Sequence, residues 1–267
     1  MKTIDGIGLA DVQAVYSGAE GLLWELVMGE QIHIGGFASS LDLAEKAQIA
    51  GSSSGVDLCC CNGAGMRFLL RFANVAKMTG VDATQTVIDQ GRQRCQSEGL
   101  DDRINFVLAD ACETTLPDAE ADFVWGEDAW CYVCDKAALI AEAARLVKPG
   151  GTIAFTDWVE GPAGLSNEEA ERFLTFMKFP NIQDIEGYSK LLAGNGCEVK
   201  IAADTERFAR YAGLYLNMLN MQLTYDALKI IGFNMELMGA MGVEMEFMKT
   251  LADEGKITQG LFVATKA

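Results

Sequence analysis

The sequence is poor in positive charge, in histidine and in proline, and it has no long apolar run. Its 267 residues include 21 Lys and Arg against 38 Asp and Glu, a formal net charge of −17 at pH 7. Nucleic acids and anionic membranes both require a basic protein face, so we expect neither as a partner. No apolar run reaches the length of a membrane span, and residues 1–8 lack the pattern of a leader. We therefore expect a cytoplasmic protein.

Eight cysteines are present, but their spacing does not suit a disulfide framework. Cys59, Cys60 and Cys61 are consecutive, and neighbours on one strand cannot all be joined to distant partners, so we expect reduced thiols. Cys131 and Cys134 form one C-x-x-C pair without a second pair, and His33 is the only histidine. A structural zinc site needs more ligands than this, so we predict no metal.

Short apolar runs alternate with amphipathic stretches between about residues 54 and 157. Strands are predicted over 54–61, 76–82, 104–109, 121–126 and 152–156, and helices over 66–76, 84–95 and 136–147. Strand–helix repeats of this length predict an α/β fold with a parallel, doubly wound, Rossmann-like sheet.

The remaining chain is predicted to complete a seven-stranded, mostly parallel sheet. A helix over 185–193 precedes a strand over 198–202, and a last strand over 257–265 is expected to run antiparallel to its neighbours. We predict a helical cap over 1–50, the sheet domain over 51–203 and 256–267, and a helical Met-rich insertion over 204–255. The methionines either fill a core or form an adaptable lid, and the insertion equally suits the contact of a homodimer.

Acidic residues lie at or near four predicted strand ends, all on one edge of the sheet. They are Asp57, Asp82, Asp110 and the pair Glu127 and Asp128. Gly63 and Gly65 in the first turn allow a ligand to approach the backbone closely. Asp82 is placed to accept hydrogen bonds from ribose hydroxyls, and Asp110 from an adenine amino group. The alternative for each acid alone is a helix cap or a solvated loop.

These residues resemble the class I S-adenosylmethionine-dependent methyltransferases over nearly the whole chain. Within that class the sequence is most similar to the sarcosine and dimethylglycine N-methyltransferases, with the phosphoethanolamine methyltransferases as cousins. The resemblance is carried by 31–35 (Gln-Ile-His-Ile-Gly), 56–63 (Val-Asp-Leu-Cys-Cys-Cys-Asn-Gly), 80–82 (Gly-Val-Asp), 109–111 (Ala-Asp-Ala), 125–129 (Trp-Gly-Glu-Asp-Ala) and 145–151 (Arg-Leu-Val-Lys-Pro-Gly-Gly).

The resemblance implies a site for S-adenosylmethionine and its product S-adenosylhomocysteine. The residues expected there are Tyr16, His33, Asp57, Cys59, Cys61, Gly63, Asp82, Ala83, Asp110, Ala111 and Glu127. Asp128 and Tyr16 are expected to orient the substrate as catalytic residues. Trp24, Trp130 and Tyr132 are expected to bind it, because aromatic faces stabilise the cation that forms on a methylated amine.

Two departures from the family pattern affect these expectations. Cys59 and Cys61 replace the first two glycines of the usual Gly-x-Gly-x-Gly turn, which adds a Cβ and a sulfur beside the expected cofactor. Tyr132 stands where the cousins often place the histidine of an Asp–His dyad with Asp128. The sequence therefore leaves cofactor affinity open and argues against a histidine base.

The acceptor predicted from the resemblance is a small amine such as sarcosine or dimethylglycine. The Met-rich insertion favours an alternative, a larger apolar acceptor such as a quinone, a phenol or a natural product. A substrate carboxylate needs a cation, for which the sequence offers Arg67 and Lys178. A non-catalytic protein that binds S-adenosylmethionine and an NAD-dependent oxidoreductase are the remaining alternatives.

Overall fold

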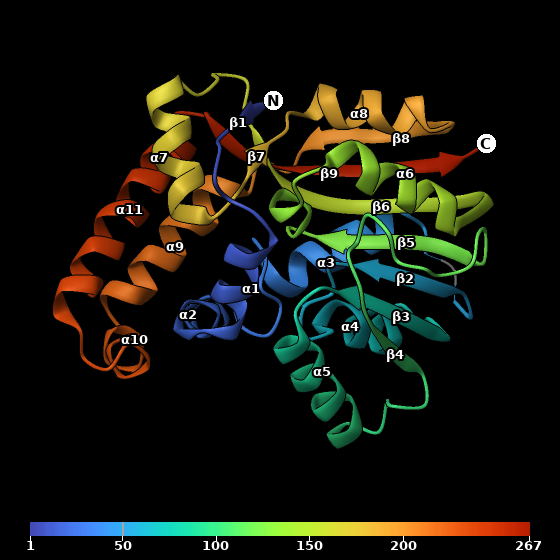
Figure 1. Ribbon diagram of the computed structural model, residues 1–267, viewed down its shortest axis with the longest axis horizontal. Coiled ribbons are helices and arrows are strands. Elements are labelled where there is room, and N and C mark those ends of the chain that lie inside the picture. Colours follow the sequence, from blue (N-terminus) through green and yellow to red (C-terminus); the bar gives the residue numbers. More distant parts are fainter. Residues whose placement is uncertain (50) are drawn as a thin grey trace.

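A seven-stranded sheet runs through the molecule in the order β4-β3-β2-β5-β6-β9-β8 (Figure 1). The computed structural model describes residues 1–49 and 51–267. The strands are β2 Ser54–Leu58, β3 Lys77–Asp82, β4 Ile104–Leu108, β5 Ala121–Glu127, β6 Val147–Glu160, β8 Cys197–Asp204 and β9 Ile257–Lys266. The first five strands in this order, β4 to β6, pair in parallel. Strand β9 pairs antiparallel with both β6 and β8. The predicted mostly parallel, doubly wound sheet is confirmed.

Helices cover both faces of this sheet (Figure 1). The helices α3 Gly36–Lys46, α4 Ala64–Phe72 and α5 Gln85–Ser97 bury apolar side chains, Leu43, Met66 and Ile88 among them, on one face. The helices α6 Lys136–Leu146 and α8 Ile185–Gly194 bury side chains such as Leu139 and Leu192 on the other. The crossovers return every parallel strand in the same direction, so the loops after β2, β3, β4 and β5 meet at one edge.

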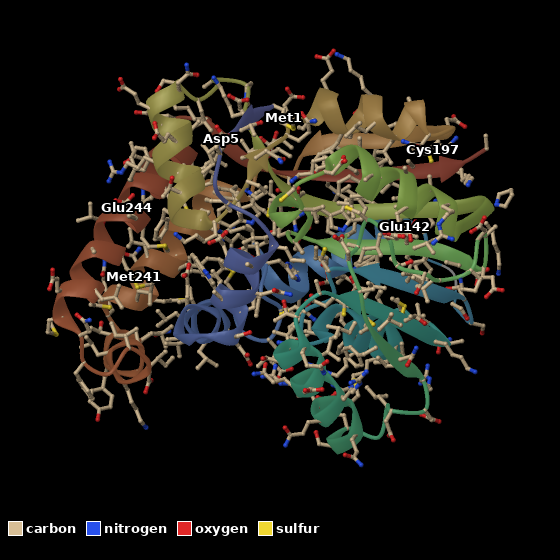
Figure 2. The ribbon with its side chains drawn as sticks, in the orientation of Figure 1. Met1, Asp5, Glu142, Cys197, Met241 and Glu244 are labelled. Atoms are coloured by element: carbon tan, nitrogen blue, oxygen red, sulfur yellow. The ribbon has the colours of Figure 1, made fainter. Side chains whose placement is uncertain are left out.

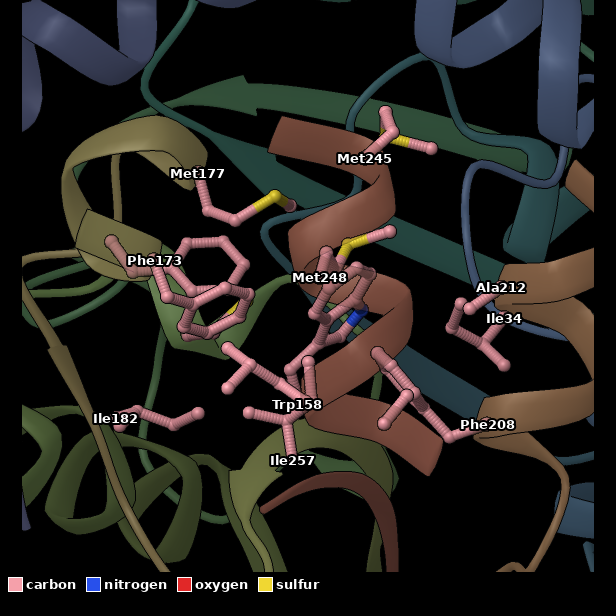
Figure 3. Packing of buried hydrophobic residues seen from close by; sticks show 14 of the residues in the cluster. Ile34, Trp158, Phe173, Met177, Ile182, Phe208, Ala212, Met245, Met248 and Ile257 are labelled. Carbon is pink, nitrogen blue, oxygen red and sulfur yellow. The ribbon is translucent and has the colours of Figure 1, made fainter. Parts of the chain in front are cut away.

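A third group of helices lies beyond that edge (Figure 1). It consists of α1 Leu9–Ser17, α2 Ala19–Met28, α7 Asn167–Met177, α9 Phe208–Asn220, α10 Thr224–Ile230 and α11 Met235–Asp253. Trp158 at the end of β6 packs against Phe173 and Phe208 in a separate apolar core, which Figure 3 shows from close by. This core joins the segment before β2 to the insertion before β9.

The methionines of the insertion fall into two groups. Met245 and Met248, on the C-terminal half of α11, are buried against Trp158 and its neighbours (Figure 3). Met221 and Met235 are 80% and 67% exposed. Core filling therefore accounts for the first pair and for the half-buried Met218, which packs against the same core, but not for Met221 and Met235. Met241 and Glu244 lie at the end of the molecule far from Cys197 of β8 (Figure 2).

The division into cap, sheet domain and lid, or dimer contact, stays a proposal, and its boundary at residue 50 lies outside the described residues.

The structure changes the sequence-based assignment at the start of β6. Helix α6 ends at Leu146, within one residue of the predicted end, and β6 begins directly at Val147 and not at residue 152. Gly150 takes a φ of 78° there, and the register with β5 shifts between Ala121 and Phe123, so the segment forms an irregular strand start. Of the helices in the described residues, none is long and apolar enough to cross a bilayer.

A helix and a small sheet were not predicted. Helix α7 begins after Ser166, whose hydroxyl accepts from the Glu169 amide while Glu169 accepts from the Ser166 amide. This Ser-x-x-Glu capping box is a sequence signal for a helix start. Strand β1, Lys2–Thr3, pairs with β7, Asn181–Ile182. Strands this short carry no periodic signal that sequence reasoning can use.

Candidate active site

A pocket of about 320 Å³ lies over the carboxyl ends of β2 to β5, under α1 and the loop before α3. Its lining brings together most of the residues singled out from the sequence. They are Tyr16, His33, Asp57, Cys59, Cys61, Asp82, Ala83, Asp110, Ala111, Glu127, Asp128 and Tyr132. Strand direction explains the convergence, since parallel strands present all their carboxyl ends at one edge.

Three predicted residues do not line this pocket. Trp24 packs in the apolar core of the helical layer. Trp130 is fully buried, stacks on Phe155 with ring centroids 4.0 Å apart and donates through Nε1 to the Leu58 carbonyl at 3.1 Å. Large aromatic rings gain most from full burial, and both Trp side chains are placed accordingly. Gly63 starts α4 with a φ of 76°, and a Cβ there would lie 2.7 Å from the ring of Phe106, so it supports the turn from behind.

The turn after β2 is held in an unusual backbone conformation. Cys59 and Cys61 have φ values of 64° and 48°, in the left-handed region that favours glycine. Each such residue costs about 1 kcal/mol relative to the right-handed conformation. The turn is fixed to β3 because the Cys61 amide donates to Asp82 Oδ2 at 2.9 Å and the Thr84 amide donates to Oδ1 at 2.8 Å. Burial raises the pKa of both thiols, so they line the pocket as neutral groups.

Two carboxyl groups face each other beside the first turn of α4. Glu127 Oε2 accepts from Trp125 Nε1 at 3.0 Å, whereas Glu127 Oε1 is buried without a hydrogen-bond partner in the described structure. Burial, followed by the nearby charge of Glu127, raises the pKa of Asp57 well above its usual range. A Cβ at Gly65 would lie 3.0 Å from Glu127 Oε2 and 3.5 Å from Asp57 Oδ2. Glycine therefore leaves a space in which a ligand cation can reach both acids.

The loop before α3 covers this end of the pocket. His33 Nε2 lies 3.0 Å from Gln31 Oε1 and 3.4 Å from Glu127 Oε1. Gln31 Nε2 donates to the Ala64 carbonyl in the first turn of α4 at 3.1 Å. Gln31 was not among the predicted site residues, although it begins the 31–35 motif. The loop and α4 thus form one hydrogen-bonded unit around the acids.

Asp128 holds this loop in place. Its Oδ2 accepts from the Ile34 amide at 2.8 Å, and Gln259 Nε2 of β9 donates to Oδ1 and Oδ2 at 2.9 and 2.8 Å. Tyr215 of α9 adds a further link, because its hydroxyl accepts from the Gly35 amide at 3.1 Å. Burial raises the pKa of Asp128. This geometry gives Asp128 a positioning role, and the predicted contact with substrate stays a prediction.

Two tyrosines form the opposite side of the pocket. Tyr16 of α1 and Tyr132 contact edge to face, with ring centroids 5.5 Å apart. Burial raises the pKa of both phenols well above the usual range, so both stay neutral. Gln13 Nε2 ties α1 to the Ala83 carbonyl at 2.7 Å. Leu9, Val12 and Ile32 extend this side and were not predicted. No local pattern marks Leu9 and Val12, whereas Ile32 lies in the 31–35 motif.

The short helix that carries Tyr132, η1 Trp130–Tyr132, rests on a buried polar cluster. Asp157 Oδ1 accepts from the Cys131 amide at 2.9 Å, and Oδ2 accepts from the Tyr188 hydroxyl at 2.6 Å. Lys136 Nζ donates to the carbonyls of Cys131 and Val133 at 3.2 and 2.5 Å. Burial, partly offset by Lys136, raises the pKa of Asp157 to about 7. Both polar groups of the Cys131 backbone are therefore fixed by buried ionisable side chains.

The residues around the pocket do not form a metal centre. Throughout residues 1–49 and 51–267, no group of three or more His, Cys, Asp or Glu is arranged to hold a metal ion. Of the C-x-x-C pair, Cys131 is fully buried and Cys134 is exposed.

Residues 56–155 match the family model described as a methyltransferase domain. This stretch of the chain is therefore similar to a methyltransferase domain. The match runs from β2 through β6 and includes every strand whose carboxyl end contributes to the pocket.

Curated relatives of this chain have varied acceptors in their names. It is 31% identical over 158 residues, 58% of this chain and 57% of the relative, to 27-O-demethylrifamycin SV methyltransferase of Amycolatopsis mediterranei. It is 30% identical over 175 residues, 59% of this chain and 61% of the relative, to dimethylglycine N-methyltransferase of Parasynechococcus marenigrum. The chain spans less than two thirds of the length of these relatives.

Solved structures with the same fold also differ in their named activities. Phosphoethanolamine N-methyltransferase 2 of Haemonchus contortus, in complex with phosphomonomethylethanolamine and S-adenosylhomocysteine, superposes with a TM-score of 0.81 at 17% identity, over 95% of this chain and 58% of that chain. The cyclase SpnF superposes with a TM-score of 0.79 at 19% identity, over 99% and 98%. The chain therefore has the Rossmann-like fold that was predicted, and at these identities the likeness concerns the fold alone.

Proposed function

We propose that the protein transfers a methyl group from S-adenosylmethionine to a small-molecule acceptor. The observation that carries the proposal is the arrangement of Asp82 and Glu127 at two strand ends of one pocket. Asp82 anchors the turn in which Cys59 and Cys61 replace glycines, and Glu127 offers a buried oxygen that has no hydrogen-bond partner in the described structure. The methyltransferase domain match and the methyltransferase relatives support the same reaction class.

The pocket suits the parts of this cofactor one by one. Glu127 Oε1 and Asp57 are available for its ammonium group, and Gly65 leaves the room. The N-terminus of α4 offers backbone dipoles to its carboxylate, because the first turn of a helix favours anions. Asp82 is available to the ribose hydroxyls, and Asp110 with Ala111 to the adenine. A ligand cation beside Asp57 and Glu127 would also relieve the repulsion that raises the pKa of Asp57.

The bound cofactor supplies an electrophilic methyl group on a sulfonium ion. Displacement from a sulfonium is in line, so the protein has to hold the acceptor atom against the methyl carbon and exclude water. Helix α1, Tyr16 and Tyr132 enclose the side of the pocket where an acceptor would lie. Neutral phenol hydroxyls there orient an acceptor by hydrogen bonds without needing a histidine base.

Two alternatives remain testable. A protein that binds the cofactor without turnover would use the same acids, and the shared fold of the cyclase SpnF illustrates that this architecture serves other reactions. An NAD-dependent oxidoreductase would also use a carboxylate such as Asp82, but Glu127 and Asp57 suit an ammonium group that NAD lacks. The methyl-transfer proposal accounts for both the ribose-side and the ammonium-side acids.

The test is calorimetric titration of the purified protein with S-adenosylmethionine and S-adenosylhomocysteine, with NAD as the control. Micromolar binding of both adenosyl compounds and none of NAD is expected. A screen for methylated products from amines, phenols and apolar alcohols then follows, with Glu127→Gln as the variant that keeps the shape and removes the charge. Absence of adenosyl binding would refute the proposal. Binding without any methylated product would favour the non-catalytic alternative.

A further inference from the structure

The charges around the pocket are unevenly distributed. Its described lining contains seven Asp and Glu side chains and one histidine, and no Lys or Arg is among these lining residues. The histidine, His33, directs Nε2 toward Glu127 Oε1 at 3.4 Å. Any anion that enters the pocket therefore meets acidic side chains close by, in a concave site where repulsion is screened less than in bulk water.

Basic residues around the pocket are engaged by other protein groups. Arg94 pairs through Nη2 with Glu25 at 2.6 Å, and its Nη1 lies 3.9 Å from Glu30. Arg67 is buried, donates through Nη1 to the Asn62 carbonyl at 2.7 Å and pairs through Nη2 with Glu30 at 2.5 Å. Lys136 is buried behind η1 and donates to two backbone carbonyls. Lys178 lines a different groove, between α2, α7 and α11. Neither cation that the sequence offered for a substrate carboxylate, Arg67 or Lys178, reaches the acceptor side.

The wall on the acceptor side is apolar and aromatic. Leu9, Val12 and Ile32 come from the N-terminal segment, and Tyr16 faces Tyr132 across it. The first turn of α4 offers donors for one anionic group, and in the proposed function the cofactor's own carboxylate takes them. A second carboxylate, or a phosphate, would lose its hydration without gaining a cation.

We propose that the acceptor carries no anionic group and presents an apolar body to the wall formed by Leu9, Val12, Ile32 and the two tyrosines. The inference rests on the proposed methyl transfer, and it separates the two acceptor classes that the sequence left open. Sarcosine and dimethylglycine both bear a carboxylate, so the pocket rejects them by repulsion and selects an uncharged phenol, alcohol or carbon nucleophile. Rejection by like charge is an established route to specificity.

A first test measures the charge selection of the pocket without requiring the natural acceptor. Neutral iodoacetamide and anionic iodoacetate alkylate the same thiols, and Cys112 and Cys134 line the pocket. Mass spectrometry gives the alkylation rate of each cysteine in the folded protein. Each rate is divided by the rate of the same cysteine in the urea-unfolded chain. We expect folding to slow iodoacetate at least about tenfold more than iodoacetamide, with the difference shrinking at high salt. Equal slowing of the two reagents would overturn the proposal.

A second test uses matched acceptors and a charge placed on the wall. Methyl 4-hydroxybenzoate with 4-hydroxybenzoate, and dimethylglycine methyl ester with dimethylglycine, are compared for binding to the S-adenosylhomocysteine-loaded protein and for methylation. Each ester should bind at least about tenfold more tightly than its acid and be methylated at least about tenfold faster. Val12→Arg should reduce that preference. Ala10→Arg adds the same charge on the exposed side of α1 and should leave the preference unchanged. Preferential use of an acid by the native protein would overturn the inference. Failure of S-adenosylhomocysteine to bind would instead refute the proposed function.

Discussion

The two sides of the pocket are built by different means. One side consists of acids at or near the carboxyl ends of parallel strands in one sheet, namely Asp57, Asp82 and Glu127. On the other side, the N-terminal segment and η1 supply apolar and aromatic side chains. Asp128 and Gln259 hold the loop before α3, and Asp157 holds η1. The comparison suggests that the strand side recognises the feature common to many reactions, the cofactor, whereas the second side is free to vary with the acceptor.

The largest effect should come from the polar support beneath the second side. Asp157 has a folded-state pKa of about 7, above its unfolded value near 3.8. Its contribution to stability is therefore full below about pH 4 and is lost as the pH rises toward 7. The difference in unfolding free energy between the native protein and Asp157→Asn should fall by up to about 4 kcal/mol over that range, at 1.36 kcal/mol per pKa unit.

Urea unfolding at several pH values measures this difference. The control is Asp122→Asn, because Lys148 lowers the pKa of Asp122 and its contribution should change with pH in the opposite direction. A constant difference between the native protein and Asp157→Asn from pH 4 to 7 would contradict the assignment.

On the strand side, Asp82→Ala should weaken S-adenosylhomocysteine binding about 100-fold, or about 2.7 kcal/mol. The substitution removes the acceptor for the Cys61 and Thr84 amides as well as the expected ribose contact. Calorimetry measures the affinity, and circular dichroism verifies the fold. Asp89→Ala, on the exposed face of α5, is the matched control and should bind normally. Unchanged affinity in Asp82→Ala would remove Asp82 from the site.

The link between the two sides should be worth somewhat less. Gln259→Leu leaves the buried Asp128 carboxylate without two of its hydrogen bonds, at an expected cost of about 2 kcal/mol in unfolding free energy. Asp128→Asn should cost a similar amount, because its amide would face the Gln259 amide. It should also lower turnover more than cofactor affinity, since the loop it holds covers the pocket.

Urea unfolding and steady-state kinetics measure these two quantities. Gln93→Leu, an exposed change of the same kind on α5, should leave both unaltered. Equal losses of turnover and of cofactor affinity in Asp128→Asn would place Asp128 in direct contact with the cofactor.

The smallest effect concerns the strained turn. Cys59→Gly and Cys61→Gly each relieve a positive φ, but glycine also gains entropy in the unfolded chain, so a stabilisation below about 1 kcal/mol is expected. Cys60→Gly is the control, because Cys60 is buried at an ordinary φ and its loss should destabilise the protein. Thermal unfolding, measured with and without S-adenosylhomocysteine, compares the stability of the Cys59 and Cys61 variants with that of the Cys60 control. Destabilisation in all three variants would show that the thiols contribute more through packing than they cost in strain.

The strand side was predictable and the second side was not, for physical reasons. Strands alternate with helices in a pattern that sets the direction of each strand. The sequence alone therefore places Asp57, Asp82 and Glu127 on one edge of the sheet. Trp24 and Trp130 were predicted at the pocket from chemistry alone, and the structure buries both in apolar cores. Which face of a tryptophan is covered depends on segments far away in the sequence.

The supporting residues illustrate the same limit. Gln259 and Asp157 lie within strands whose sequences are typical of a buried core. Their roles depend on hydrogen-bond partners distant in the sequence, Asp128 at 131 residues from Gln259 and Cys131 at 26 residues from Asp157. Ser166 and Glu169 are the opposite case, since a local capping pattern could have located α7 from the sequence. Local signals therefore yield elements, and the closure of the pocket requires the tertiary structure.

The bond from Gln259 to Asp128 has a consequence for how the protein is made. Gln259 lies on β9, which inserts between β6 and β8, while the loop that it helps to hold belongs to the first 40 residues. Contacts of such long sequence separation form late in folding. A chain synthesised only as far as β6 lacks Gln259 and so cannot yet form the bonds that fix the loop over the pocket. Tight cofactor retention would then mark only those molecules whose final strand has been inserted, and the cofactor would stabilise these selectively.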